Sequence, residues 1–327
     1  MLLALAPRAS GQSGTDPSTP KLSLAVLLSD VEPLRDREAR EAELFYAAVR
    51  AEWTRKHWGA RAEVRGKDGR FRPYFRGDIW LEEGYAYLTT KLGEVRVGKL
   101  ERETFLADDT FGGNLLSLNG LTRNPDFGAG LFGSRRFEYD LLSWSLVYFG
   151  QNDHVAFERD GVGVESDPAA KLRDGLEARG SYKVNKGLTT FTPGVSVATA
   201  RIVPDAGAEL RRTDVGADVT ATLGPLSAAL GVVRRKGDDG RERLGYHDAW
   251  AGILAIRAEF PTVVYRYTYT EWRYGGAAFN ERLHQPAAVW NPVKGIEATI
   301  EYEARRLRSP SGARVFNAFR FGLTLAF

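Results

Sequence analysis

The sequence predicts an all-β protein, a closed up-and-down barrel of antiparallel strands, on three observations. First, segment after segment alternates apolar and polar residues with a period of two, the pattern of a strand with two different faces. Second, short and long connections alternate along the chain, as they do when turns gather at one rim of a barrel and loops at the other. Third, 35 Gly, 17 Phe, 13 Tyr and 7 Trp, with one Met, favour turns, strands and aromatic belts over helices.

The C-terminal segment alternates most clearly. One face of residues 315–327 carries Val315, Phe319, Phe321, Leu323, Leu325 and Phe327, with Asn317 as the one interruption. The opposite face carries Ala318, Arg320, Gly322, Thr324 and Ala326. A strand this apolar on one face needs a large apolar partner, which is lipid when the other face lines a lumen. The sequence therefore predicts a transmembrane barrel whose apolar face points outward.

Sixteen segments fit strands, an even number as this architecture requires. In chain order they are 21–30, 44–56, 58–66, 78–90, 93–104, 128–136, 140–151, 174–184, 189–202, 211–222, 225–235, 247–258, 261–273, 284–290, 295–306 and 315–327. The segments 21–30, 128–136 and 284–290 are weak, so fourteen strands also fit. Residues 34–44 are compatible with a helical turn or two, and the alternation slips near Glu82-Glu83 and Lys99, where we expect bulges.

The longer connections are rich in charge, Gly and Asp. They are expected at 66–77, 105–127, 152–174, 203–211, 235–246, 274–283 and 307–314. Acidic residues in these loops leave calcium binding from outside open, although such loops are more often simply solvated.

Residues 21–327 form one unit, since no linker divides them. Ahead of it, residues 1–11 combine an apolar run, Leu2–Ala6, with small residues, and we interpret them as the remnant of a signal peptide. A disordered N-terminus is the alternative, and residues 12–20 are expected to be flexible. The 45 basic and 42 acidic side chains are interspersed, a distribution that argues against nucleic-acid binding.

Signatures of catalysis are poor in this sequence. The four His residues lie far apart, no Gly-x-Ser-x-Gly motif occurs and the chain has no Cys. We therefore predict no enzymatic activity, no catalytic residues, no cofactor and no metal site.

With the connection between segments 21–30 and 44–56 counted as the first, residues 105–127 form the third long loop and contain Asp109-Thr-Phe-Gly-Gly113. This loop resembles that of the bacterial outer-membrane porins, which folds inward, narrows the pore and carries Pro-Glu-Phe-Gly-Gly; the match here is Phe-Gly-Gly alone. A final strand ending in Phe327 is also similar to the closing strand of outer-membrane barrels. The resemblance implies a Gram-negative outer membrane, a homotrimer as a common assembly, and Phe327 as part of the signal read by the barrel-assembly machinery.

Arginines on the barrel wall that face an acidic loop would create a transverse field in the pore. Our candidates for constriction and selectivity are Asp108 and Asp109 on the loop and Arg50, Arg61, Arg65 and Arg96 on the wall. In the alternative interpretation the loop lies at the surface, and the arginines pair with neighbouring glutamates, such as Arg61 with Glu63 or Arg50 with Glu52. Both signs of charge are abundant on the expected lumen face, so ion preference does not follow.

The function expected from these features is a porin-like outer-membrane channel for passive diffusion of small hydrophilic solutes or ions. The alternatives are a substrate-specific outer-membrane uptake or export channel, a structural barrel plugged by its loops, and a soluble all-β binding protein. Steady conductance that sugars and phosphate leave unchanged would support passive diffusion, whereas block of the channel by one class of solute would support a substrate-specific channel.

Overall fold

The computed structural model describes residues 21–33, 41–66, 79–100, 126–151, 171–203, 209–224, 226–237, 246–257, 262–274 and 277–326. Sixteen strands fill these ranges, as expected. They are β1 (Lys21–Pro33), β2 (Glu41–Thr54), β3 (Trp58–Gly66), β4 (Ile79–Thr90), β5 (Gly93–Leu100), β6 (Asp126–Phe137), β7 (Asp140–Gln151), β8 (Lys171–Lys186), β9 (Thr189–Val203), β10 (Leu210–Leu223), β11 (Leu226–Gly237), β12 (Tyr246–Arg257), β13 (Thr262–Tyr274), β14 (Ala277–Val293), β15 (Ile296–Ser309) and β16 (Gly312–Ala326).

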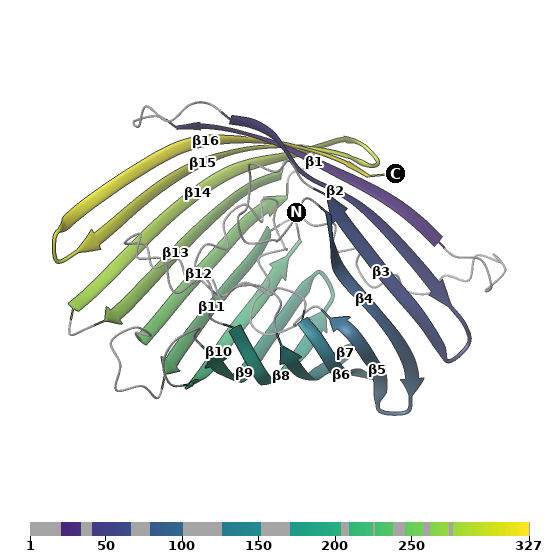
Figure 1. Cartoon of the computed structure of the whole chain (residues 1–327). Helices are drawn as coiled ribbons and strands as arrows, with labels where there is room; N and C mark the ends of the chain where they lie inside the picture. Colours follow the sequence, from purple (N-terminus) through teal and green to yellow (C-terminus); the bar gives the residue numbers. More distant parts are fainter. Residues whose placement is uncertain are drawn as a thin grey trace.

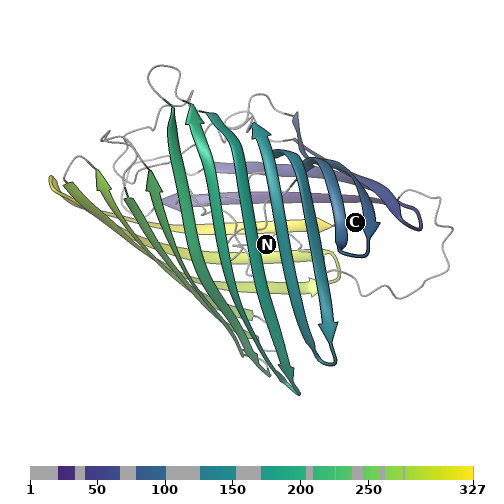
Figure 2. The same ribbon diagram turned by 90° about the horizontal axis from the view of Figure 1, so that it is seen from below.

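Each strand pairs antiparallel with its neighbours in sequence, and β1 closes the barrel by pairing with both β2 and β16 (Figure 1). At the closure Val26 lies opposite Leu325 of β16, and Leu24 lies opposite Val49 of β2, so the apolar faces of the three strands coincide. The strands on the two sides of the barrel run at a large angle to one another in Figure 2, as strand tilt in a closed barrel requires. The described part of the chain contains no helix that is long and apolar enough to cross a membrane.

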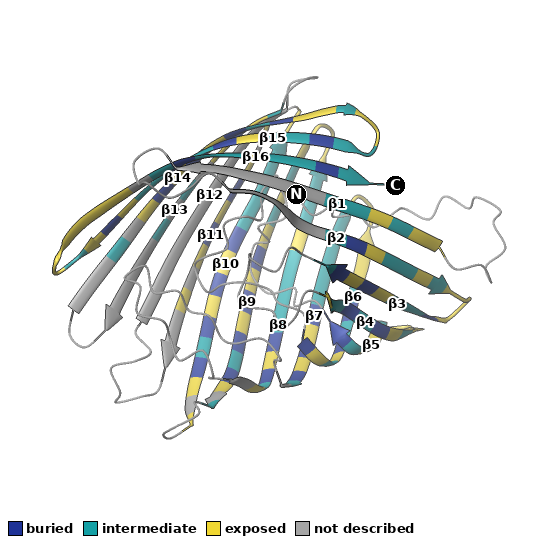
Figure 3. Cartoon of the chain, turned by 45° about the horizontal axis from the view of Figure 1, so that its top comes forward, coloured by how far each residue is buried: buried dark blue, intermediate teal, exposed yellow. Residues whose placement is uncertain are grey.

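Burial alternates along the strands in the reverse of the soluble pattern (Figure 3). On β10, Arg212, Asp214 and Asp218 are buried while Val215 is 54% exposed. On β15, Glu301 is buried and Ile300 exposed. Polar residues therefore face the interior of the barrel and apolar residues face outward, the arrangement of a barrel that lipid surrounds. The faces agree with those expected for the C-terminal strand, where Val315 and Phe321 are exposed and Ala318 is buried.

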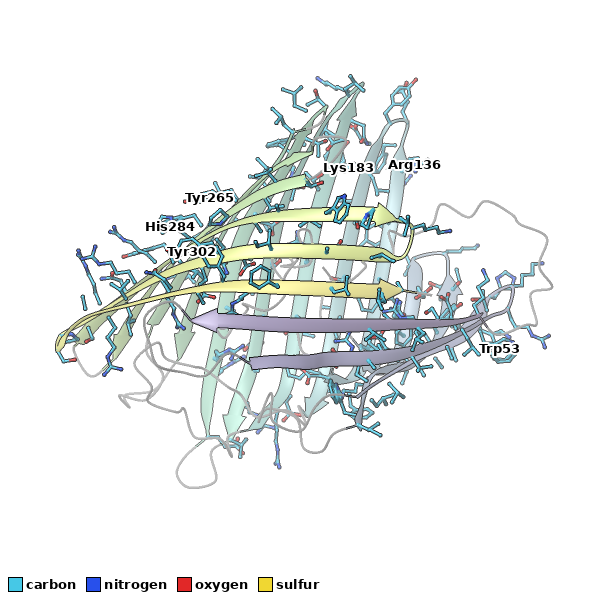
Figure 4. The ribbon with its side chains drawn as sticks, turned by 90° about the horizontal axis from the view of Figure 1, so that it is seen from above. Trp53, Arg136, Lys183, Tyr265, His284 and Tyr302 are labelled. Carbon is cyan, nitrogen blue, oxygen red and sulfur yellow. The ribbon has the colours of Figure 1, made fainter. Side chains whose placement is uncertain are left out.

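Outward-facing aromatic rings lie at the short-turn rim and within the apolar band. At the turn between β2 and β3, Trp53 and Trp58 pack edge to face with ring centroids 4.7 Å apart. Tyr265, three residues after β13 begins, shares a hydrogen bond with Nδ1 of His284 at 2.7 Å, and Figure 4 shows both near Tyr302 on the green and yellow strands. Rings such as those of Trp53 and Trp58 suit the interface of a membrane.

The predicted bulge at Glu82 is confirmed, whereas that at Lys99 is wrong. Glu63 of β3 pairs with Glu83, and the next residue, Val64, pairs with Leu81, so Glu82 is the extra residue. No register shift occurs at Lys99, which pairs with Phe127 of β6 in an unbroken series and forms the last pair of β5 with β4.

Two of the long connections expected from sequence are also wrong. β14 begins at Ala277, inside the expected loop 274–283, and Pro310 and Ser311 alone connect β15 to β16, inside 307–314. Strand ends that project beyond the membrane need no apolar face, so their charged sequences resemble those of loops. Residues 41–44, within the segment compatible with a helical turn, are part of β2. The proposed segments 1–11 and 12–20 lie outside the described residues.

Candidate functional site

The inward face of β2 to β5 carries four arginines and four glutamates, which we call the paired wall. Its members are Arg50, Arg61, Glu63, Arg65, Glu82, Glu83, Glu94 and Arg96. Glu63 lies at the centre, where it accepts hydrogen bonds from Nε of Arg50 at 2.6 Å and from Nε of Arg65 at 2.7 Å. Arg65 also reaches Glu82 at 2.8 Å, and Arg61 pairs with Glu83 at 3.0 Å. Each guanidinium in this group is therefore neutralised by the wall itself.

Strand register produces these pairs. Arg50 and Glu63 lie directly opposite one another across β2 and β3, within reach of a long side chain. The bulge at Glu82 then supplies an additional residue, so that the adjacent carboxylates of Glu82 and Glu83 both reach inward arginines of β3. Regular alternation would have turned one of the two outward.

Arg96 of the paired wall also stacks on aromatic rings. Its Nε lies 2.6 Å from Glu94, and its guanidinium carbon lies 4.0 Å from the ring centroid of Phe132 and 5.2 Å from that of Tyr85. Phe132 and Tyr85 belong to a buried cluster with Leu100 and Val147. Such stacking fixes the orientation of the guanidinium plane and adds cation–π attraction.

A second charged group lies on β8 to β10. Arg179 forms a two-pronged ion pair with Asp218, at 2.5 and 2.7 Å, and donates to Ser196 at 2.9 Å. The guanidinium crosses intervening strand β9 at Gly194, where a Cβ would lie 2.6 Å from Nη2 of Arg179 and 2.8 Å from Oδ1 of Asp218. The absence of a side chain at this position makes the contact between β8 and β10 possible.

The third group, on β14 to β16, has a different composition, and we call it the acidic wall. Its members are Gln285, Glu297, Glu301, Glu303 and Arg320. Three glutamates share the inward face of one strand, β15, and all are buried. Arg320 forms an ion pair with Glu303 at 2.7 Å, and the amide of Gln285 lies 3.4 Å from Glu301. Oε2 of Glu297 has no hydrogen-bond partner among the described residues.

The sequence places Arg50, Arg61, Arg65 and Arg96 on the inward face, and the structure describes them there. Their expected partners were wrong, however, because Arg50 pairs with Glu63 and not Glu52, and Arg61 pairs with Glu83 and not Glu63. Pairing along one strand does occur elsewhere in the wall, since Arg65 reaches Glu63 and Arg96 reaches Glu94, whereas Arg50 and Arg61 find their carboxylates on the facing strand. Asp108, Asp109 and Phe327 lie outside the described residues, and so does the loop 105–127 except Asp126 and Phe127, which begin β6.

Sequence reasoning missed the carboxylates of Glu82, Glu83 and Glu94 as partners of the candidate arginines. The doubled glutamate at 82 and 83, which interrupts the alternation, was the available signal. Within the ranges that the structure describes, no three His, Asp or Glu side chains are placed to hold a metal ion.

Comparison with known proteins gives the same architecture. No protein-family model and no curated protein matches the sequence. Three solved structures cover nearly all of both chains. OmpF of Salmonella typhi in complex with daunomycin matches with a TM-score of 0.71 at 11% identity, covering 95% of this chain and 98% of its own. An anion-selective porin from Comamonas acidovorans gives 0.67 at 11% identity, covering 94% and 99%. The outer-membrane protein OmpT of Vibrio cholerae, in a trimer form, gives 0.64 at 12% identity, covering 95% and 100%.

At such low identity the likeness establishes the fold and not the activity. The chain has a porin-like β-barrel fold: all-β, antiparallel, with sixteen strands in a closed barrel.

Proposed function

We propose that this protein is a porin-like channel of the bacterial outer membrane, through which small hydrophilic solutes or ions diffuse passively. The observation that carries the proposal is the opposition of the two barrel faces: ion-paired arginines and carboxylates inside, exposed Val, Leu, Phe and Trp outside. A soluble all-β protein would have to hide that outer face, whereas lipid covers it without further structure. The similar structures are outer-membrane proteins, which supports the location.

Transport through such a lumen requires binding and field effects but no covalent chemistry. Fixed charges and hydrogen-bonding groups on the wall replace part of a solute's hydration shell, and the sign of the unpaired charge biases which ions enter. In our proposal no residue acts as an acid, base or nucleophile, and the protein is not an enzyme.

The constriction remains part of the proposal. Asp108 and Asp109 would supply negative charge from the loop 105–127, opposite Arg61 and Arg65. Since these arginines are already paired with Glu83, Glu63 and Glu82, the wall would contribute oriented dipoles more than free positive charge. Assembly would use Phe327 as the signal for the barrel-assembly machinery, and a homotrimer is supported by the trimer form of one similar protein.

The test is to refold the protein in detergent, check for heat-modifiable electrophoretic mobility, and insert it into planar lipid bilayers. We expect stepwise insertions with steady conductance that sugars and phosphate leave unchanged. Folded barrels that insert without conducting would overturn the channel and indicate a structural barrel.

A second candidate, a channel specific for one class of solute, is favoured by the stacking of Arg96 on Phe132 and Tyr85, since such a group can bind a solute that is both anionic and flat. Block of the conductance by one solute class, lost in the Arg96→Gln variant, would support it.

A further inference from the structure

Three outward-facing arginines lie close together at the loop-side rim, on β14 and β15. Arg282 lies directly opposite Arg306 across these strands, and Arg308 is the next outward residue of β15. All three side chains are exposed. Directly opposed residues of an antiparallel pair have Cβ atoms about 4.5–5.5 Å apart, and like charges at that position repel.

No described acidic side chain relieves this repulsion. Among the residues whose side chains the structure describes, no carboxylate forms an ion pair with Arg282, Arg306 or Arg308; Arg282 instead lies 6.0 Å from the ring centroid of Tyr269. The inward arginines Arg61 and Arg179 are paired with carboxylates. Arg201, which faces outward at the same rim on β9, is also paired, with Asp174 and Glu209. Within the part of the chain that the structure describes, the three arginines thus form a site of positive charge without a carboxylate partner.

The height of the three arginines on the barrel indicates which chemical group could balance their positive charge. The outward residues of β15 run Ile296, Ala298, Ile300, Tyr302 and Ala304 before Arg306 is reached. From Ile296 to Arg306 the strand covers about 33 Å at about 3.3 Å per residue, and a tilt of about 40° reduces this to about 25 Å, the height of an apolar membrane band. The arginines therefore lie immediately above the apolar band, at the level of lipid headgroups.

We propose that Arg282, Arg306 and Arg308 bind the phosphate of an anionic lipid in the leaflet at the loop-side rim. Guanidinium groups present several N–H donors in a planar fork that matches phosphate oxygens, and the apolar side chains below would contact the acyl chains of the same molecule. A soluble anion would use only the first of these two features. The inference rests on the proposed membrane location but not on conduction.

The experiment uses the full-length protein, refolded in detergent, with heat-modifiable mobility as the measure of folding for every variant. Native mass spectrometry follows the lipid that remains bound after titration with phosphatidic acid or phosphatidylcholine. Wild type should retain phosphatidic acid preferentially, and the double variant Arg282→Gln/Arg306→Gln should lose that preference by about thirtyfold, as expected for two headgroup-level charges. Arg201→Gln is the matched control and should bind as wild type does, because Arg201 is already paired.

Three results would overturn the proposal. Equal retention of the two lipids by wild type would show that phosphate is not recognised. Displacement of phosphatidic acid by millimolar inorganic phosphate would assign the site to free anions. A change in the mass of the protein assembly in the double variant, with lipid retention unchanged, would assign the arginines to a contact between copies. Conductance is measured in parallel, so a conducting variant that has lost lipid separates this inference from the channel.

Discussion

The paired wall of β2 to β5 and the acidic wall of β14 to β16 flank β1 on its two sides, yet they handle charge differently. Along the inward face of β3, the order Arg61, Glu63, Arg65 alternates in sign, and neighbouring strands continue the alternation. Along β15, Glu297, Glu301 and Glu303 repeat the same sign before Arg305 follows on the same face. The comparison teaches that the order of charges along a strand, and not the number of charged residues, determines whether opposite charges alternate within it; for Glu303 of β15 an opposite charge comes from Arg320 of the facing strand.

The largest effect should come from the outer faces of the two walls, which are alike. Val64→Arg on the outer face of β3 and Ile300→Arg on the outer face of β15 should each lower the free energy of unfolding by about 2–4 kcal/mol, because both place a charge in the apolar band. Urea unfolding in lipid vesicles, followed by tryptophan fluorescence, measures the loss. Thr299→Arg, one residue from Ile300 but inward, is the control. An equal loss for Thr299→Arg and Ile300→Arg would refute the assignment of faces.

Replacing a buried glutamate by glutamine should destabilise the protein more in the paired wall than in the acidic wall. Glu63→Gln removes the shared partner of Arg50 and Arg65, and should cost about 1.5–3 kcal/mol, the range for hydrogen bonds to charged groups. Glu297→Gln should cost close to nothing, since one of its carboxylate oxygens has no hydrogen-bond partner in the described part of the barrel. The same unfolding assay measures both changes in stability. A larger loss of stability for Glu297→Gln than for Glu63→Gln would contradict the comparison.

The ion pair between Arg179 of β8 and Asp218 of β10 is an intermediate case, because it forms only where Gly194 of β9 has no side chain. Gly194→Ala should displace Arg179 from Asp218 and destabilise the barrel by about 1 kcal/mol, the typical net value of a hydrogen bond. Arg179→Gln should then add little to Gly194→Ala in the same protein. Full additivity of the two substitutions would show that the alanine leaves the ion pair intact.

Changes of ion selectivity should be the smallest effects, and their sign is the informative part. Glu301→Gln with Glu303→Gln should move the reversal potential in a salt gradient toward anion preference. Arg61→Gln with Glu83→Gln removes one charge of each sign and should leave it unchanged. Salt screens these charges, with a Debye length of about 10 Å at 0.1 M, and so limits the size of the shift in reversal potential. A shift for the neutral pair that exceeds that for the two glutamates would contradict the comparison.

The same recording tests the loop. Asparagine at both Asp108 and Asp109 should shift selectivity toward anions, whereas glutamine at both Arg61 and Arg65 should shift it toward cations. If neither pair changes the reversal potential, residues 105–127 do not enter the lumen.

Strand number and facing were predictable because a barrel in lipid imposes a strict period of two on every strand. Even the weak segment 284–290 was part of a strand, although β14 proved much longer, at Ala277–Val293. The predicted strand ends were wrong at Arg308 and its neighbours, because lipid imposes no alternation of apolar residues there. The wall arginines were found from their facing alone. Their partners were not, because pairing depends on cross-strand register, and one bulge at Glu82 changes which carboxylates face inward.

The most direct test of the channel is swelling of proteoliposomes in isotonic sugars of increasing size. Vesicles that contain the folded, heat-modifiable protein should swell in a pentose, more slowly in a disaccharide, and least in a tetrasaccharide, because a wet lumen of fixed width sieves neutral solutes by size. Vesicles that contain the same amount of folded protein and do not swell in any of these sugars would contradict the central claim that the barrel interior is an open, polar passage.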